Sequence, residues 1–215
     1  MKFLTIAKIL LVLILPVLLI LLSTNFAGFN LSFYKEKFQQ YNVEKNVPGA
    51  ESLHNKVIDF IKGNSNQPPN EFNEKEKQHL WDVKNVIRYG KILLYILVIL
   101  FIFLLLFSAF IIKANNAITN FIGKIFLYGG ILTIAIAAIL FFMINFDFSK
   151  TFETFHLTFF KSGTYVFDAK EKIVNLYPEQ LFMDLGLRIS KWVVISAAII
   201  MLIGLFLLFR SKKNK

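Results

Sequence analysis

The sequence contains no cysteine, and its three histidines are His54, His79 and His156. The lack of cysteine excludes disulfides, a thiol nucleophile, zinc–thiolate sites and a lipidated cysteine on this chain. The sequence also lacks a Gly-x-Ser-x-Gly elbow, a His-Glu-x-x-His zinc motif, a P-loop and a dinucleotide-binding fingerprint. Histidines with carboxylates can bind a metal in principle, but no spacing in this sequence supports a metal site, so none is predicted.

Charged residues are almost absent from four long apolar runs. Of the 215 residues, 56% are hydrophobic, and the mean hydropathy is +0.58, which is too apolar for a soluble domain of this length. The runs predict transmembrane helices at about residues 5–27, 91–113, 122–146 and 191–210. Because the spans lack charge, a transporter or channel is disfavoured. We expect an all-α membrane protein, a four-transmembrane-helix bundle that forms a single integral membrane domain over residues 1–215.

The first apolar run has an alternative interpretation as a cleaved signal peptide. Asn25-Phe26-Ala27-Gly28 is a poor small-x-small cleavage site, and the run is longer than a usual signal-peptide core. A retained helix is therefore favoured, and Pro16 is expected to kink it without disrupting the span.

The distribution of charge predicts the orientation in the membrane. If both termini are cytoplasmic, the inside segments hold eight basic residues and no acidic ones, and the outside segments hold the other 16 basic and all 14 acidic residues. This arrangement satisfies the positive-inside rule. The net charge of +10 is then mostly a topology signal, so nucleic acid is not an expected partner. Membrane lipids are expected partners of the basic cytoplasmic residues.

Two outside segments, at about residues 28–90 and 147–190, are expected to form a small, mostly helical extracytoplasmic cap. Residues 51–62 have the pattern of an amphipathic helix, and residues 63–70 read as a linker. Asn73 is predicted to cap a helix with Glu76 as its capping-box partner, and that helix continues into the second span with a possible bend at Gly90. In the second segment we expect an interfacial aromatic stretch at 152–160, a turn at 162–164 and a short helix at 168–177.

The three histidines differ in their sequence surroundings. His54 is predicted to lie on the polar, exposed side of its helix. Asp82 follows His79 at i+3, and Glu153 precedes His156 at i−3, so either carboxylate is a candidate to orient its imidazole. His79 and His156 are open to two interpretations. One is an interfacial polar residue, and the other is a general base that accepts and returns protons near neutral pH.

Two histidine motifs carry a resemblance to a known family. The first is Glu76-x-x-His79-Leu80-x-Asp82-Val83-Lys84. The second is Phe155-His156-x-x-Phe159-Phe160, followed by Phe167-Asp168 and by Leu176-x-Pro178-x-x-Leu181-Phe182-x-Asp184. With four spans at this spacing, nearly the whole chain resembles the lipoprotein intramolecular transacylases of low-GC Gram-positive bacteria. It departs from them at Tyr165, where a tryptophan is expected, and at Glu171-Lys172-Ile173.

The resemblance implies a membrane acyltransferase that acts on diacylglyceryl-modified lipoproteins in the bacterial cell membrane. Such enzymes move the sn-2 acyl chain to the α-amino group of the same cysteine, giving an N-acyl lyso-form lipoprotein. The reaction needs no cofactor and no enzyme nucleophile, because both reacting groups belong to one substrate. His79 and His156 are the implied catalytic pair at the extracytoplasmic face. Asp82 and Glu153 are supporting candidates. The oxyanion donor is left open between the second histidine, Tyr165, Arg188 and backbone amides.

The alternative function is that of a non-catalytic membrane scaffold or lipid-binding partner of an envelope complex. In that case the histidines are incidental and the two outside segments bind a partner. The oligomeric state is not predicted.

Overall fold

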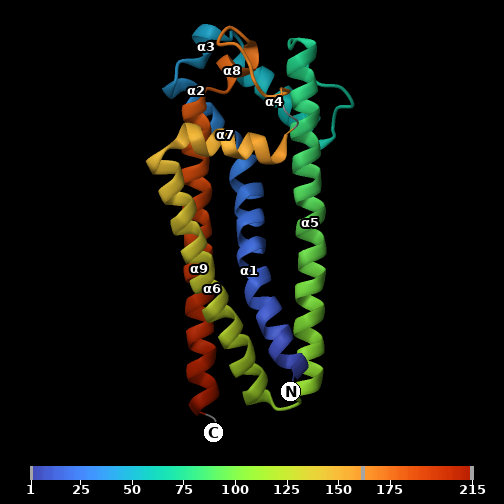
Figure 1. The fold of residues 1–215 in the computed structure, drawn as a ribbon, viewed down its shortest axis with the longest axis vertical. Helices are drawn as coiled ribbons and strands as arrows, with labels where there is room; N and C mark the ends of the chain where they lie inside the picture. The colour runs from blue at the N-terminus through green and yellow to red at the C-terminus, as the bar shows by residue number, and fades with distance from the viewer. Residues whose placement is uncertain (1, 161–162, 214–215) are drawn as a thin grey trace. The chain divides into compact units, whose positions relative to one another are not determined.

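The computed structural model describes residues 2–160 and 163–213, which form α-helices and no strands (Figure 1). The helices are α1 (Lys2–Gly28), α2 (Leu31–Gln40), α3 (Val43–Asn46), α4 (Ala50–Lys62), α5 (Glu74–Ile112), α6 (Asn115–Phe146), α7 (Phe148–Phe159), α8 (Lys172–Leu176) and α9 (Glu179–Lys213). Within the described residues, α1, α5, α6 and α9 are long and apolar enough to cross a membrane. The all-α, four-span fold class is confirmed.

The chain divides into two compact units. The membrane unit comprises Met1–Asn25, Lys91–Phe142 and Arg188–Lys215, and the cap unit comprises Phe26–Gly90 and Met143–Leu187. The cap unit is built from the same two segments that the sequence places between spans, at 28–90 and 147–190. The helices α5 and α9 each contribute their first turns to the cap unit and the remainder to the membrane unit.

The helices of the membrane unit approach one another closely at glycines of α6 and α9. A Cβ atom added to Gly204 would lie 2.9 Å from the carbonyl oxygen of Gly123 and 2.8 Å from the amide nitrogen of Leu127. A Cβ added to Gly129 would lie 2.6 Å from the Leu15 side chain of α1. Association of helices in lipid depends on such close packing because lipid offers no hydrophobic driving force.

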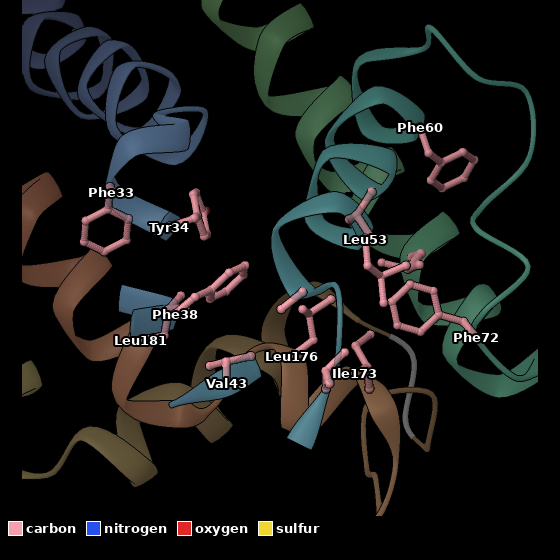
Figure 2. Packing of buried hydrophobic residues seen from close by; sticks show 14 residues of the cluster. Phe33, Tyr34, Phe38, Val43, Leu53, Phe60, Phe72, Ile173, Leu176 and Leu181 are labelled. Carbon is pink, nitrogen blue, oxygen red and sulfur yellow. The ribbon is translucent and has the colours of Figure 1, made fainter. Parts of the chain in front are cut away.

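The cap unit has an apolar core of its own, to which both of its segments contribute (Figure 2). Phe33 and Phe38 of α2 and Leu53 of α4 belong to the same cluster as Leu176 of α8 and Leu181 of α9. Each Å² of apolar surface removed from water stabilises the fold by about 25 cal/mol, so this cluster is the main stabilising contribution to the cap unit. The two segments therefore fold as one cap, as expected from their many apolar residues.

Several local predictions are confirmed. The amphipathic helix predicted at 51–62 is α4, and α5 begins at Glu74, within the capping box that Asn73 and Glu76 form. α5 remains helical across Gly90 on its way into the second span.

The short helix predicted at 168–177 is wrong at its start, because α8 covers Lys172–Leu176. The preceding residues form a turn instead. The amide of Asp168 donates to the Glu171 carboxylate at 2.7 Å, and the amide of Glu171 donates to the Asp168 carbonyl at 2.9 Å. Of the turn predicted at 162–164, Ser162 lies outside the described residues, and Gly163 has a φ of +88° that favours glycine.

Candidate active site

His79 is held in the first turns of α5 by a reciprocal capping box. The amide of Glu76 donates to the Asn73 side chain at 2.9 Å, and the amide of Asn73 donates to the Glu76 carboxylate at 2.7 Å. These bonds use backbone donors that a helix N-terminus otherwise leaves without partners. His79 follows Glu76 by three residues and therefore projects from the adjacent turn of the same helix.

The His79 imidazole is buried among aromatic rings, with 8% of the residue exposed. Its ring centroid lies 5.0 Å from that of Phe160 and 5.3 Å from that of Phe167. The pKa of His79 is lowered to about 4, mainly by burial and also by the charge of a protonated His156, and Asp82 opposes both effects. His79 is therefore neutral at physiological pH. Its Nδ1 has no hydrogen-bond partner among the described residues, and neither does the buried Oδ2 of Asp82.

His156 lies in the middle of an aromatic stripe along α7. Asp147 caps α7 by accepting a hydrogen bond from the Lys150 amide at 3.0 Å. The helical period then places one face in register, which consists of Phe148, Phe152, Phe155, His156 and Phe159, with Phe160 at the end of the helix. Phe155 and Phe159 are exposed at the edge of this stripe, and their rings are 4.9 Å apart.

The hydrogen bond of His156 defines its tautomer. Nδ1 lies 2.8 Å from the carbonyl oxygen of Phe152, and because a carbonyl only accepts, Nδ1 must carry the proton. The neutral ring therefore presents Nε2 as a proton acceptor. Burial lowers the pKa of His156, against the opposing effect of its hydrogen bond to Phe152.

The two histidines lie side by side within the cap. Their rings are stacked, with centroids 6.0 Å apart and planes inclined by 20°. His79 comes from the start of α5 and His156 from α7, so the pair is formed by the two segments of the cap unit. This separation is short enough for one ester group and one amine to contact both rings. The two histidines are therefore close enough to belong to one site, whereas their catalytic roles remain predictions.

The supporting candidates fall into different places. The Tyr165 ring lies 5.1 Å from that of His156. Glu153 is exposed, and Nδ1 of His156 donates to the Phe152 carbonyl rather than to this carboxylate. Arg188 lies in α9 and belongs to the membrane unit.

The prediction that His54 lies on an exposed surface is wrong. His54 is 3% exposed, because Tyr34 of α2 stacks on its ring at 4.1 Å and Phe38 covers its edge at 5.5 Å. Its Nδ1 lies 2.9 Å from the Tyr177 hydroxyl. Burial lowers the pKa of His54 to about 4. The face of α4 that is covered is thus wider than its apolar residues alone indicate.

Two features of the cap were not recognised from the sequence. The Tyr41 hydroxyl donates to Asp184 at 2.7 Å and Lys37 pairs with the same carboxylate at 2.8 Å, which joins α2 to the start of α9. The Glu76 carboxylate also accepts a hydrogen bond from the Ile173 amide at 2.8 Å, in addition to its capping bond. A capping box predicts only the local bond, since the partner from α8 is remote in sequence.

A surface pocket of about 650 Å³ lies over the junction between α5 and α8, lined by Glu71, Asn73, Glu76 and residues 168–172. The two stacked histidines do not line it, so the pocket is separate from the site built on the rings. Among the described residues, no group of three or more His, Asp or Glu side chains is placed to hold a metal ion.

These features define a multi-pass membrane protein with a histidine pair in its cap. The sequence profile of the family "Lipoprotein intramolecular transacylase Lit" matches residues 9–182. The chain therefore belongs to the lipoprotein intramolecular transacylase family and is an acyltransferase that acts on lipoproteins. No curated protein sequence matches the chain.

Solved structures support the fold. The chain is similar to the membrane-integral lipoprotein intramolecular transacylase Lit from Bacillus cereus, with a TM-score of 0.81 and 18% identity over 97% of each chain. It is also similar to two variants of that protein in which one histidine is replaced. For the arginine variant the TM-score is 0.80 at 17% identity, covering 98% of this chain and 94% of that one. For the alanine variant the TM-score is 0.80 at 17% identity, covering 97% and 95%.

Proposed function

We propose that the chain moves the sn-2 acyl chain of a diacylglyceryl-cysteine lipoprotein to the α-amino group of the same cysteine, with His79 and His156 as the catalytic residues. The observation that carries this proposal is the stacked pair of histidine rings, 6.0 Å apart. Aromatic side chains contact both rings and form an apolar surround that suits a lipid ester. Proximity of amine and ester is supplied by the substrate itself.

His156 is the proton carrier in this proposal. The neutral α-amine attacks the ester carbonyl, and the nitrogen of the tetrahedral intermediate passes one proton to Nε2 of His156. The imidazolium then returns that proton to the sn-2 glycerol oxygen as its bond to carbon breaks. An amide and a free hydroxyl replace an ester and an amine, so no water, cofactor or second substrate is consumed. The bond from Nδ1 to the Phe152 carbonyl supports this role, because it directs the basic Nε2 lone pair away from the helix backbone.

His79 stabilises the oxyanion in its neutral form. An imidazole whose pKa is about 4 does not bind a proton at neutral pH, yet it still has one N–H to donate. Such a donor in a water-excluded site stabilises developing negative charge without titrating. Tyr165, next to His156, is a candidate second donor, and Arg188 is a further candidate.

Asp82 prepares the amine. The buried Oδ2 of Asp82 has no hydrogen-bond partner among the described residues, and a substrate ammonium supplies the donor that it lacks. The same carboxylate opposes the lowering of the His79 pKa. We assign Asp82 the binding of the α-amino group before it loses its first proton.

The site faces the extracytoplasmic side, and both termini are cytoplasmic. Support comes from the charge distribution, with eight basic and no acidic residues in the segments assigned to the inside. Because the chain has no cysteine, single cysteines introduced at positions 64 and 214 report the topology. A membrane-impermeant maleimide applied to intact cells should label position 64 and leave position 214 unlabelled.

The catalytic assignment is tested in cells that lack the enzyme and express wild type, His79→Ala or His156→Ala. Mass spectrometry of lipoprotein N-termini should show an acyl chain on nitrogen and one on glycerol only with the wild type. General acid–base catalysis contributes roughly 10²–10⁴-fold and one oxyanion donor roughly 10²–10³-fold, so each alanine variant should lose about 10²-fold or more. His54→Gln is the matched control, because His54 is buried outside the histidine pair. Full activity of both alanine variants at equal protein levels contradicts the assignment.

A further inference from the structure

Glu76 is a buried carboxylate that serves two helices at once. The residue is 2% exposed. One carboxylate oxygen accepts from the Asn73 amide at 2.7 Å, before α5, and the other accepts from the Ile173 amide at 2.8 Å, in α8. A charged group is rarely buried unless such bonds compensate for lost hydration, and hydrogen bonds to charged groups are stronger than neutral ones.

The bond to Ile173 replaces a cap that α8 does not provide for itself. Glu171 occupies the N-cap position of α8, but its side chain makes no capping hydrogen bond. That side chain is used elsewhere, accepting from the Asn73 side chain at 3.2 Å and from the Asp168 amide at 2.7 Å. The Ile173 amide in the first turn of α8 thus receives its acceptor from another helix.

Further contacts join the same two stretches of chain. Lys172 donates to the carbonyl oxygen of Glu71 at 2.7 Å, and Lys75 donates to the carbonyl oxygen of Val166. Lys75 also lies over the Phe167 ring, 5.1 Å from its centroid. Unlike Glu76, both lysines are exposed, so each of these contacts contributes less to the junction than a fully desolvated bond.

The junction is connected to the histidine pair on both of its sides. His79 is one turn beyond Glu76 on α5. On the other side, the segment that precedes α8 carries Phe167, 5.3 Å from the His79 ring, and Tyr165, 5.1 Å from the His156 ring. The position of these two rings against the histidines therefore depends on how the segment is attached to α5.

We propose that Glu76 is a positioning residue of the transacylase, which fixes the aromatic wall of Tyr165 and Phe167 against His156 and His79 through its bond to α8. This inference rests on the proposed function of the histidine pair. Glu76 does not touch the reacting atoms, and its effect is transmitted through α8 and the segment before it.

Glu76→Gln is the sharpest substitution, because it keeps the size of the side chain. The amide retains one acceptor oxygen, but its NH₂ group faces a backbone N–H and cannot accept from it. The side chain therefore loses its hydrogen bond either to the Asn73 amide or to the Ile173 amide. Displacement of active-site residues by about 1 Å costs on the order of 10²-fold in rate. We expect kcat to fall roughly 10–100-fold with a smaller change in KM. Glu74→Gln is the matched control, since that side chain is 90% exposed in the same helical turn.

Three readouts separate positioning from a general loss of structure. Hydrogen exchange should increase in peptides that cover residues 163–176 and stay unchanged in α4. Loosening the wall hydrates His79, which the titratable groups His156 and Asp82 face, so the pKa of His79 should rise from about 4 toward its ordinary value of 6.5. The acid limb of the kcat/KM profile should therefore gain an inflection between these two pH values. The third readout is rescue by a cross-link. Cysteines at positions 73 and 171, whose native side chains are 3.2 Å apart, are joined by a short bis-methanethiosulfonate linker in the Glu76→Gln chain.

The cross-link restores the attachment without the carboxylate, so activity should recover at least tenfold when it forms and fall again on reduction. Wild-type activity of Glu76→Gln overturns the inference, and so does a cross-linked Glu76→Gln chain that remains inactive although the same cross-link in a chain that keeps Glu76 is active. If Glu76→Gln does not fold alone, the measurement is made on the chain cross-linked during purification, before and after reduction in detergent. A wild-type chain without transacylase activity refutes the proposed function instead, whatever the exchange data show.

Discussion

The Nδ1–H of His156 donates a hydrogen bond at 2.8 Å to the carbonyl oxygen of Phe152, one turn earlier in α7. A carbonyl that accepts from an imidazole fixes one tautomer and so fixes which nitrogen is basic. In this protein the basic nitrogen is Nε2, on a ring that stacks with His79.

The pH dependence of kcat/KM should follow the titration of the substrate amine rather than that of the histidines. The pKa of His79 is about 4, and burial lowers the pKa of His156 from its ordinary value of 6.5, so both rings are mainly neutral above pH 6.5. An α-amine titrates at about 7.7–8.0. We expect kcat/KM to rise with pH through that range, measured with a synthetic lipopeptide in proteoliposomes. A main inflection near pH 6.5 contradicts the proposal.

Asp82→Asn should reduce activity about 10–100-fold, because the substrate ammonium loses its charged acceptor. Removing the carboxylate also removes the effect that opposes lowering of the His79 pKa, so that pKa should fall further. NMR titration of labelled histidine detects this shift. Glu153→Gln is the control and should stay within about twofold of wild type, since Glu153 is exposed and surface charges contribute little. Equal losses in both variants refute a specific role for Asp82.

The exposed edge of the aromatic stripe should contact the acyl chain that is transferred. Phe155 and Phe159 are 45% and 55% exposed and continuous with His156. Replacing both by Ala should raise KM several-fold for long-chain lipopeptides and flatten the dependence on chain length, because each buried methylene contributes about 0.8 kcal/mol. Leu157→Ala is the matched control, being 61% exposed on another face of α7. Unchanged chain-length dependence in the double variant contradicts this contact.

His54 should make the stability of the cap depend on acid. Its folded pKa is about 4, against an ordinary value of 6.5, so the unfolded chain binds a proton first as the pH falls. Stability is complete above pH 6.5 and declines toward pH 4, by at most about 3 kcal/mol. His54→Gln should be less stable at pH 7.5 but lose less stability between pH 7 and 5. Thermal unfolding in detergent at several pH values measures both effects, and an identical pH slope in the two proteins rules out His54 as the source.

Gly204→Ala should destabilise the membrane unit by about 1–3 kcal/mol, the range for overpacking a close contact. The added Cβ would meet the backbone of α6 at 2.8–2.9 Å, and backbone yields less readily than a side chain. Gly90→Ala is the control, because nothing lies within 4 Å of its Cβ position and alanine favours helix. The order of thermal midpoints should be Gly90→Ala at or above wild type and Gly204→Ala below it.

The sequence by itself determined the features that depend on local pattern or on total composition. Four uncharged apolar runs of helical length define the spans, because a bilayer allows only helices or closed barrels to cross it. Asn73 and Glu76 define the start of α5 for a similar reason, since a capping box involves residues three apart. The family motifs around His79 and His156 likewise lie on short stretches of chain.

Only the tertiary structure decided which remote groups meet. His54 has a polar neighbourhood in sequence, and its burial arises from Tyr34 and Tyr177, which come from two other elements. The start of α8 was misplaced because its first turn depends on Glu76, 97 residues away. The stacking of His79 on His156 is likewise a contact between segments separated by a long stretch of chain. Periodicity specifies which face of a helix is apolar, whereas packing in three dimensions specifies which residues cover that face. The tautomer and pKa of a buried imidazole depend on those covering residues.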